Sequence, residues 1–406
     1  MGKNLVICCD GTNNQFGSNN TNVVKLVQAL DRNPAKQVVY YDPGVGTMPE
    51  PGFVTPIGKW ISKVFGLGFG AGLSGKIAEA YTFLMDQYQP GDRIYMYGFS
   101  RGAYTVRALA GVLNQFGLLP PGAYNLIPYA LRYSKAINQL DNASPDSADL
   151  YWNVCAGFKE AFSRINVMGG KATRRVPIHF LGLWDTVSSV GWVWEPVHFP
   201  YTTNNPSVEI IRHAISLDEH RAFFRQNRWT INGQPSQDAL EVWFPGVHCD
   251  VGGGYAENDF DYRGGLWRAP FLWMIRESVK AGLVIRNSKV REILKRTPCR
   301  LPVWAGQQHE SLDWRWWLAE FLPKMRMNKQ SGTKLPHLNL FRHRTVSEGT
   351  LLHRSVLRRI RKKDLNYAPP NLSREFLEKV RALKNIPETL PYQYEMETAE
   401  LVSVCK

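Results

Sequence analysis

The sequence has few cysteines, and they do not form a disulfide or zinc-binding pattern. Six are spread over 406 residues at irregular intervals, and none form a C-x-x-C pair: Cys8, Cys9, Cys155, Cys249, Cys299 and Cys405. A disulfide-stapled secreted domain or a zinc ribbon would need a denser and more regular arrangement. Pairs of His and carboxylate residues at helical spacing are missing as well. We therefore expect reduced thiols, no bound metal and no cofactor.

Long apolar runs are also absent. The most apolar stretch, Gly52 to Gly75, contains Lys59 and Lys63 and is rich in glycine, which makes it a poor transmembrane helix. A signal peptide is not predicted, because a strand-like run from Asn4 to Cys9 begins almost at the first residue and leads into a polar loop. We expect a protein that is cytoplasmic as synthesised and contacts membranes only peripherally, or that is exported by a route without a signal peptide.

Acidic residues are scarce in one part of the chain. Between Arg286 and Lys363 there are 19 Lys or Arg residues and only 5 Asp or Glu residues, a difference equal to the net charge of +14. The whole chain is 44% hydrophobic and 21% charged, which is typical of a folded globular protein. We predict a near-neutral domain over residues 1–285, followed by a basic, largely helical appendage over residues 286–406 that acts as a cap or a membrane-docking region.

Before residue 285, strand-length apolar runs alternate with helical periodicity. One helix is predicted after a Thr21 cap and another from Ile77 to Tyr88, where apolar residues recur at intervals of three and four. The strand candidates are mostly apolar on both faces, as buried parallel strands are: Asn4 to Cys9, Gln37 to Tyr41, Arg93 to Tyr97, Pro177 to Trp184 and Ala239 to Phe244. This alternation predicts a doubly wound, mostly parallel α/β sheet, whose functional residues follow the carboxyl ends of strands.

The strongest motif follows the third of these strands. The run Gly98-Phe99-Ser100-Arg101-Gly102 fits G-x-S-x-G and stands between a strand and a helical run, as a nucleophile elbow requires. The serine of such an elbow has strained backbone geometry, and the residues two before and two after it must lack a Cβ that would collide. Gly98 and Gly102 meet that requirement. An ordinary glycine-flanked turn is the alternative, but the context favours Ser100 as the nucleophile.

Two later strand ends supply a base and an acid for Ser100. Asp185 and His248 each follow a predicted strand, and a glycine-rich loop surrounds His248. The order Ser, Asp, His is the chain order of α/β-hydrolases, in which the histidine is the general base and the acid orients it. A turn or N-cap role is the alternative for Asp185. Asp250 competes as the orienting acid, but residues two apart in an extended loop do not point to one partner, so we rank it second.

The polar loop after the first strand is the candidate oxyanion site. Asp10, Gly11, Thr12 and Asn13 follow one another there, and a short loop with a glycine can present backbone N–H groups to an oxyanion. We predict Gly11 and Thr12 as donors together with the amide of Arg101, the residue after the nucleophile. A phosphotransferase aspartate loop is the alternative reading, but the second aspartate two residues from Asp10 is missing.

Several of these motifs together resemble the DUF2235 family, the catalytic domain of type VI secretion phospholipase effectors of the Tle1 class. The resemblance covers about residues 3 to 285 and implies an α/β-hydrolase fold, a Ser-Asp-His triad and hydrolysis of carboxylic esters, commonly of phospholipid acyl chains. The triad of the family falls on Ser100, Asp185 and His248. The resemblance is carried by five runs: Cys9 to Asn14, Tyr41 to Thr47, Gly98 to Tyr104, Leu183 to Val187 and Pro245 to Tyr255.

The basic segment contains a Trp-rich run from Asp313 to Lys324. Five of its residues would share one helical face: Trp314, Trp317, Leu318, Phe321 and Leu322. Such a face beside basic residues is typical of an interfacial helix on anionic lipid, and a helix packed on the main domain is the equal alternative. A second basic run, Arg354 to Lys363, could contact phosphates, but no nucleic-acid fold signature accompanies it.

The sequence therefore predicts a serine esterase or lipase of phospholipase A type, acting on a small-molecule or lipid ester. Ser100 attacks the acyl carbonyl, His248 moves the proton, Asp185 orients the imidazole, and backbone amides hold the oxyanion. We expect peripheral contact with anionic membranes and no specific nucleic-acid partner. The competing function is a non-catalytic protein of the same fold, docked on anionic membranes or nucleic acid, in which Ser100 is idle.

Overall fold

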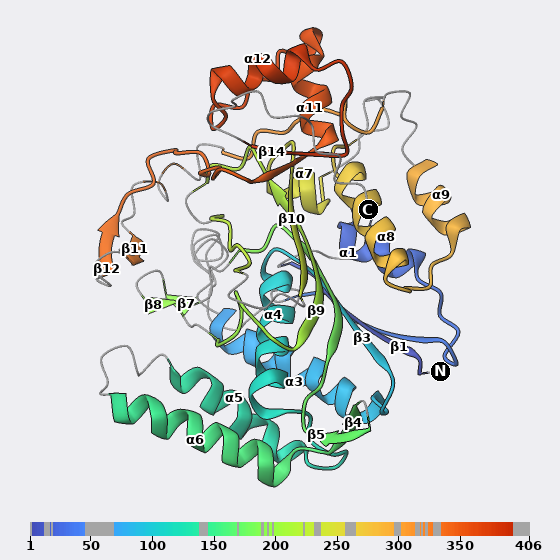
Figure 1. Ribbon diagram of the computed structural model, residues 1–406, viewed down its shortest axis with the longest axis vertical. Helices are drawn as coiled ribbons and strands as arrows, with labels where there is room; N and C mark the ends of the chain where they lie inside the picture. Colours follow the sequence, from blue (N-terminus) through green and yellow to red (C-terminus); the bar gives the residue numbers. More distant parts are fainter. Residues whose placement is uncertain are drawn as a thin grey trace, which may run out of the picture.

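An eight-stranded, mostly parallel sheet is the centre of the computed structural model (Figure 1). The strand order is β14-β13-β10-β9-β6-β3-β1-β2, and only β14 runs antiparallel to its neighbour. The structure describes residues 2–11, 17, 19–44, 69–137, 145–168, 170–187, 191–192, 195–196, 199–221, 224–230, 237–255, 265–295, 302–312, 317, 320, 324–327 and 334–392.

All five predicted strands belong to this sheet. The first has the predicted bounds, and the others differ by one or two residues at an end: β1 (Asn4–Cys9), β2 (Gln37–Asp42), β3 (Arg93–Phe99), β6 (Ile178–Trp184) and β10 (Asp238–Phe244). The Thr21 cap is also present, because its side chain accepts a hydrogen bond from the Val24 amide at the start of α1 (Asn22–Ala29). The predicted α/β fold with a doubly wound sheet is confirmed.

Three of the eight strands of the sheet were not predicted, and one of them lies in the first part of the chain. Strand β9 (Val208–Ser216) lies between β6 and β10 and pairs with both in parallel. Its apolar pattern is interrupted by Arg212 and His213, which are nevertheless buried because each has an acidic partner. Arg212 pairs with Glu277 at 2.9 Å, and His213 with Glu241 at 2.8 Å. Charged residues that are buried in pairs interrupt the apolar pattern of a strand, so hydrophobicity alone does not predict it.

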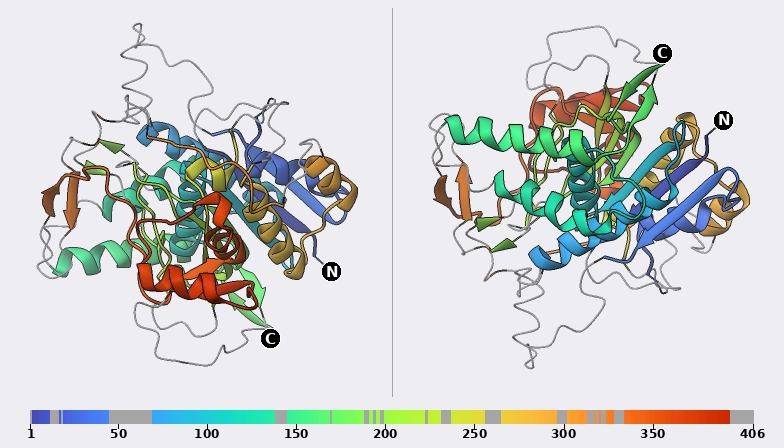
Figure 2. Two further views of the ribbon diagram at one scale, coloured as in Figure 1. Left: turned by 90° about the horizontal axis from the view of Figure 1, so that it is seen from above. Right: turned by 90° about the horizontal axis from the view of Figure 1, so that it is seen from below.

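Helices cover both faces of the sheet, as Figures 1 and 2 show. One face is covered by α3 (Phe69–Gln87), α4 (Arg101–Phe116), α5 (Ile127–Ala136) and α6 (Pro145–Phe162), and the other by α1, α8 (Arg268–Lys280) and α9 (Asn287–Lys295). Each layer has its own buried apolar core. The burial holds the strands in register, so the loops at their carboxyl ends lie along one edge.

Short elements complete the described chain. Helix α7 (His248–Gly252) follows β10, and the 3₁₀ turns are η1 (Tyr124–Leu126) and η3 (Lys363–Leu365). Three antiparallel ribbons have two strands each: β4 (Asn166–Met168) with β5 (Lys171–Thr173), β7 (Gly191–Trp192) with β8 (Glu195–Pro196), and β11 (Lys324–Met327) with β12 (Lys334–His337).

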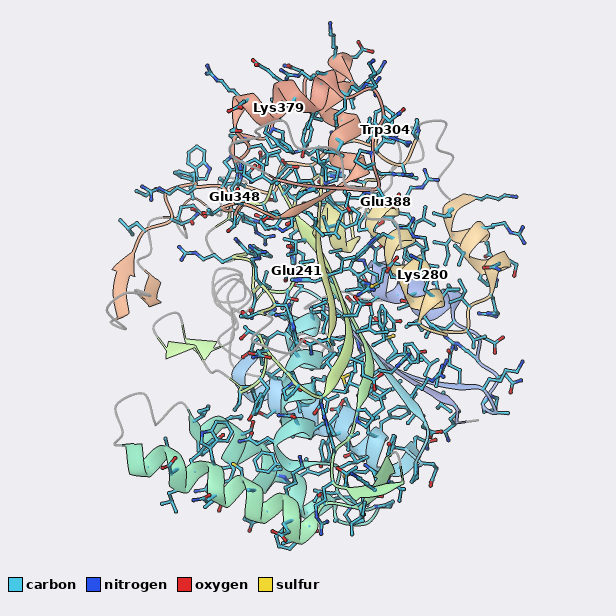
Figure 3. All side chains as sticks on the ribbon, in the orientation of Figure 1. Glu241, Lys280, Trp304, Glu348, Lys379 and Glu388 are labelled. Carbon is cyan, nitrogen blue, oxygen red and sulfur yellow. The ribbon has the colours of Figure 1, made fainter. Side chains whose placement is uncertain are left out.

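Residues after 285 contribute to the same sheet. Strands β13 (Leu351–His353) and β14 (Thr389–Pro391) extend it beyond β10, and helices α11 (Arg354–Arg361) and α12 (Arg374–Ala382) pack there around a third apolar core. Ion pairs join this part to α8, since Glu388, labelled in Figure 3, contacts both Arg276 and Arg354 at 2.8 Å. The basic segment and the preceding part of the chain therefore share one sheet.

Most of the predicted Trp-rich helical face cannot be compared with the structure. Trp314, Leu318, Phe321 and Leu322 lie outside the described residues, as does most of Gly52 to Gly75. Trp317 is in a helical position, is 55% exposed and has an edge contact with the ring of Phe341. Among the described residues, no helix is long and apolar enough to cross a bilayer.

Candidate active site

Ser100 stands at a strained turn between β3 and α4. Its φ of 58° and ψ of −123° fall in a region that non-glycine residues rarely adopt. The neighbouring glycines allow the turn to close: a Cβ on Gly98 would lie 2.5 Å from the Ala103 backbone, and one on Gly102 would lie 2.2 Å from the Cys9 carbonyl oxygen. The turn therefore has the geometry of a nucleophile elbow.

The turn at Ser100 is hydrogen-bonded to the end of the neighbouring strand β6. The Ser100 amide donates to the Trp184 carbonyl oxygen at 3.1 Å, and the Val187 amide approaches the Ser100 carbonyl oxygen at 3.5 Å. Asp185 lies between these two partners, is fully buried and has a φ of 39°. The backbone thus places Ser100 and Asp185 at the same edge of the sheet.

His248 completes this cluster. Its Nδ1 is 2.6 Å from Asp185 Oδ2, and its ring centroid lies 4.6 Å from that of Phe99, the residue before Ser100. A glycine makes the second contact possible, because a Cβ on Gly252 would lie 1.9 Å from the Phe99 ring. The expected loop around His248 is wrong: His248 is the first residue of helix α7. The helix presses against the elbow and fixes the imidazole between Phe99 and Asp185.

Sequence reasoning missed a second side-chain partner of Asp185, the guanidinium of Arg344. Its Nη1 lies 2.5 Å from Asp185 Oδ1, and its Nη2 lies 3.0 Å from Oδ2. The Ser216 amide also donates to Oδ1, at 2.9 Å. The local sequence around Arg344 gives no signal for this contact, because the residue is one of many cations in the basic segment.

Glu219, which the sequence analysis also missed, holds the backbone of His248. Its Oε2 accepts the His248 amide at 3.1 Å, and its carboxylate pairs with the Arg221 guanidinium at 2.9 Å. Glu219 is fully buried and follows the unpredicted strand β9 by three residues. Had β9 been recognised, the rule that functional residues follow strand ends would have pointed to this residue.

The electrostatics of the cluster favour a neutral histidine beside an ionised acid. Burial raises the pKa of Asp185, but Arg344 and His248 overcome this and hold it well below its usual range. Burial lowers the pKa of His248, and Asp185 only partly opposes that shift. Burial likewise raises the pKa of Glu219, yet Arg221 brings it down to about 2. Near pH 7 the imidazole is therefore a free base.

Asp250 is occupied elsewhere. Its Oδ1 lies 2.6 Å from His309 Nδ1, and its Oδ2 accepts the amides of Val247 and His309 at 3.1 Å. The carboxylate thus caps the start of α7 and does not contact His248. Its position two residues after His248 is in a helix, not in the extended loop that we expected.

The loop after β1 is organised by Asp10. Its carboxylate accepts hydrogen bonds from the Thr21 hydroxyl at 2.6 Å and the Gly11 amide at 2.7 Å. The expectation that the Gly11 amide is an oxyanion donor is therefore wrong, because Asp10 already accepts its N–H. The predicted donor Thr12 and the supporting residue Asn13 lie outside the described residues. Arg101, whose amide is the other predicted donor, begins α4 directly after Ser100.

A thiol or metal centre has no support in the described part of the chain. Cys249, next to His248, is a free cysteine, and burial raises the pKa of its thiol to about 12, so the thiol stays protonated. No group of three or more His, Cys, Asp or Glu side chains there is placed to hold a metal ion.

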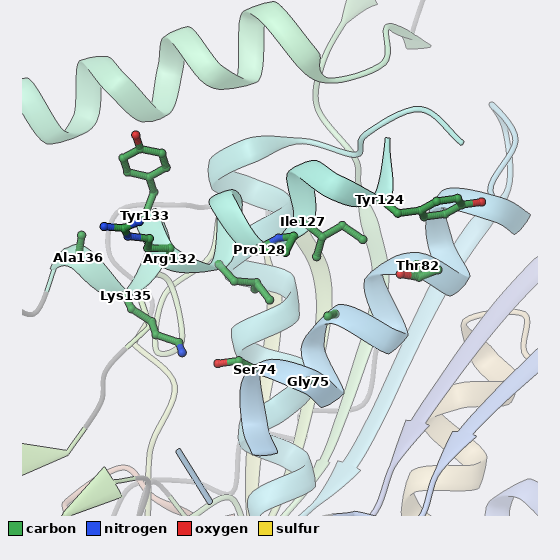
Figure 4. Close-up of a pocket in the computed structure, with 12 residues that line it drawn as sticks. Ser74, Gly75, Thr82, Tyr124, Ile127, Pro128, Arg132, Tyr133, Lys135 and Ala136 are labelled. Atoms are coloured by element: carbon green, nitrogen blue, oxygen red, sulfur yellow. The ribbon is translucent and has the colours of Figure 1, made fainter. Parts of the chain in front are cut away.

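A groove of about 860 Å³ lies between α3 and α5 (Figure 4). Its walls include the apolar side chains of Ala78, Ile127 and Leu131, and Ser74 and Lys135 lie at one end of it. That end faces the carboxyl edge of the sheet, because Lys76, two residues after Ser74, pairs at 3.4 Å with the last residue of β2. The groove therefore begins near the edge that carries Ser100.

Comparison with known proteins identifies the family of the chain. The family model described as "T6SS, Phospholipase effector Tle1-like, catalytic domain" matches residues 3–277, which is more than half of the chain. The chain belongs to this Tle1-like family. The Tle1-like match ends before Arg344, so the residue that contacts Asp185 comes from outside the matched region.

Individual relatives are longer than this Tle1-like chain. The uncharacterized protein YEL023C of Saccharomyces cerevisiae is 36% identical over 234 residues, which is 55% of this chain and 32% of the yeast protein. An uncharacterized protein from Pseudomonas aeruginosa is 19% identical with a TM-score of 0.42, covering 73% of this chain and 50% of its own. The Tle1 effector bound to the VgrG spike is 18% identical with a TM-score of 0.34, covering 63% and 51%. The chain spans about a third to a half of these proteins.

Proposed function

We propose that this Tle1-like protein is a serine hydrolase of carboxylic esters, in which Ser100, His248 and Asp185 act as a triad. The observation that supports this most is the 2.6 Å contact between His248 Nδ1 and Asp185 Oδ2, made at the sheet edge where a strained turn holds Ser100. Each of the three residues follows a different strand, β3, β6 or β10. This arrangement is the one in which α/β-hydrolases place their catalytic residues.

The proposed mechanism follows from the charges of these groups. His248 donates a hydrogen bond from its Nδ1–H to Asp185, which leaves Nε2 as the base that takes the Ser100 hydroxyl proton. The serine oxygen attacks the ester carbonyl, the amides of Arg101 and Thr12 hold the oxyanion, and the alcohol leaves with the proton from His248. Water then hydrolyses the acyl-serine by the same steps. Asp185 stabilises the imidazolium that forms in each half-reaction.

We propose lipid acyl esters as the substrate class. The family description names a phospholipase, and the groove between α3 and α5 offers apolar walls that start near the edge carrying Ser100. An acyl chain in this groove would pass Ala78 and Leu131 while its carbonyl stays at Ser100. Each buried methylene contributes about 0.8 kcal/mol, so chain length should affect kcat/KM.

Covalent labelling tests the proposal directly. A fluorophosphonate should modify Ser100 in the folded protein, and the protein should hydrolyse p-nitrophenyl esters and phospholipid vesicles. The competing non-catalytic protein would bind vesicles without reacting with the probe. Failure to label Ser100 at a pH where His248 is neutral would favour that alternative.

Filling the groove should change chain-length preference. The substitution Ala78→Trp should lower kcat/KM for a C12 to C16 ester by about tenfold or more and change that for a C4 ester by less than about twofold. The exposed Ala382→Trp is the matched control for adding an indole ring, and it should leave both values unchanged. Equal losses of kcat/KM with short and long esters in Ala78→Trp protein would show that the acyl chain does not bind in this groove.

We also propose that the basic edge beside α11 and α12 contacts anionic membranes. Its exposed cations include Arg361, Lys363, Arg381 and Lys384, and the apolar faces of both helices are buried in the third core. Surface cations can each contribute about 1 kcal/mol on an anionic leaflet. The helices thus present charge and not apolar surface to a membrane.

Charge reversal tests this contact. Lys363→Glu with Lys384→Glu should weaken cosedimentation with phosphatidylserine vesicles by at least about tenfold at physiological salt. The control is Lys36→Glu with Lys171→Glu, which changes the same charge at two other exposed lysines and should bind nearly as the unchanged protein does. If both double variants lost vesicle binding equally, the loss would come from the change in net charge, and the proposed contact at this edge would be wrong.

A further inference from the structure

We infer that Arg344 is a positioning residue of the active site, which fixes Asp185 in place and balances its charge so that His248 works as a base at neutral pH. This inference rests on the proposed function, because Asp185 and His248 are assigned to the triad there. It adds a residue from the C-terminal segment to the machinery of a family that is matched only up to residue 277.

The contacts around Asp185 carry the argument. Its carboxylate receives four donors: the Ser216 amide and Arg344 Nη1 on Oδ1, and His248 and Arg344 Nη2 on Oδ2. Arg344 thus supplies one hydrogen bond to each oxygen, in the bidentate geometry that suits a guanidinium and a carboxylate. Without it, the carboxylate could rotate about its terminal bond and lose its alignment with His248.

Arg344 is itself fixed by the same part of the sheet. Its Nη1 also donates to the Ser216 hydroxyl at 2.7 Å, and its Nε donates to the Phe224 carbonyl oxygen at 3.1 Å. Its backbone is held as well, because the Asn371 side chain donates to the carbonyl oxygens of both Arg344 and Leu217. The guanidinium nitrogens of Arg344 therefore donate to Asp185, Ser216 and Phe224.

The charges that face the pair set the direction of the effect. Asp185 and Glu219 are the acids next to His248, Arg221 neutralises Glu219, and Arg344 neutralises Asp185. Removing Arg344 leaves one uncompensated negative charge beside the imidazole, in a buried site. His248 and Asp185 titrate as a coupled pair, and this pair then binds its proton at a higher pH, whichever of the two side chains carries it. The acidic limb of the pH profile, which is the pH range over which kcat/KM falls as the solution becomes more acidic, must therefore move to higher pH.

The experiment compares Arg344→Gln, Arg344→Lys and Arg359→Gln in the full chain. Arg359 is the matched control, since it is a buried arginine of the same segment that donates to the carbonyl oxygens of Trp304 and Gly306 and not to Asp185. We expect Arg344→Gln to shift the acidic limb upward by about one pH unit or more and to lower kcat/KM at pH 7 by about tenfold or more. Arg344→Lys keeps the positive charge, so the acidic limb should stay near its original pH. Its kcat should be reduced. Arg359→Gln should lower the melting temperature without moving the limb.

A readout that needs no substrate separates this inference from the proposed function. The ¹⁵N resonances of His248, assigned by their absence in His248→Gln protein, report the protonation of the imidazole directly. If the protein hydrolyses no ester but the His248 titration still moves upward in Arg344→Gln, the hydrolase function fails and the pairing stands. An unmoved titration and an unmoved limb in folded Arg344→Gln protein would overturn the inference.

Discussion

Replacing Ser100 with alanine should lower ester hydrolysis by about 10³-fold or more in a protein that remains folded. The reason is that attack needs an oxygen at the turn where β3 meets α4, and no other described hydroxyl is held there in the strained conformation that Ser100 has. Loss of the hydroxyl also removes the site of fluorophosphonate labelling. Both losses should occur with little change in melting temperature, because an alanine can occupy the same backbone position.

Ser134→Ala is the matched control for this prediction. Ser134 is fully buried in α5, and its hydroxyl has no hydrogen-bond partner among the described residues, so its removal should leave hydrolysis and labelling unchanged. Initial rates with a C4 ester and mass spectrometry of the labelled protein check both variants. If Ser100→Ala protein still hydrolysed the ester, the nucleophile would not be the residue at this turn.

The strand ends of the sheet were the most predictable part of the site. Ser100, Asp185 and His248 were each selected because they follow an apolar run of strand length, and the structure brings the three residues to one edge. That success has a simple cause: in a parallel sheet, the positions of strand ends are set by burial, and burial is visible in sequence. The catalytic roles themselves are a separate question, which the substitutions answer.

The contacts that support these residues could not be predicted in the same way. Arg344 lies 159 positions from Asp185 along the chain, and only the tertiary fold brings the two together. Glu219 was missed because β9 carries the internal charges Arg212 and His213, which break the apolar pattern although both are buried in pairs. Buried ion pairs depend on partners far away in sequence, whereas apolar burial is a property of each segment.

The charge count of the basic segment also concealed Arg344. Counting 19 basic residues between Arg286 and Lys363 suggested a solvated or membrane-facing surface, and several of these residues are indeed exposed. Arg344 and Arg359, however, are buried and have carboxylate or carbonyl partners. A local excess of charge therefore combines two populations with different roles, and only burial distinguishes them.

The choice of triad acid leads to the second large effect. Asp185→Asn should lower kcat by about 10³-fold to 10⁴-fold, close to the loss in Ser100→Ala protein or somewhat less. The asparagine keeps the shape of the side chain but removes the charge that stabilises the imidazolium, and its amide nitrogen can turn toward Nδ1 and favour the wrong tautomer. It also leaves Arg344 buried without its counter-charge, so the melting temperature should fall.

Asp250→Asn provides a control of matched chemistry for that substitution. Asp250 is also a buried aspartate paired with a histidine, but its partner is His309, and it reaches the active site only through the backbone of α7. We expect a comparable loss of melting temperature and a loss of kcat below about tenfold, because His248 keeps its contact with Asp185. Steady-state kinetics and thermal unfolding on the two purified variants make the comparison. The reverse order of activities in folded protein would assign the orienting acid to Asp250 and would leave the Asp185 to Arg344 pair as a structural contact.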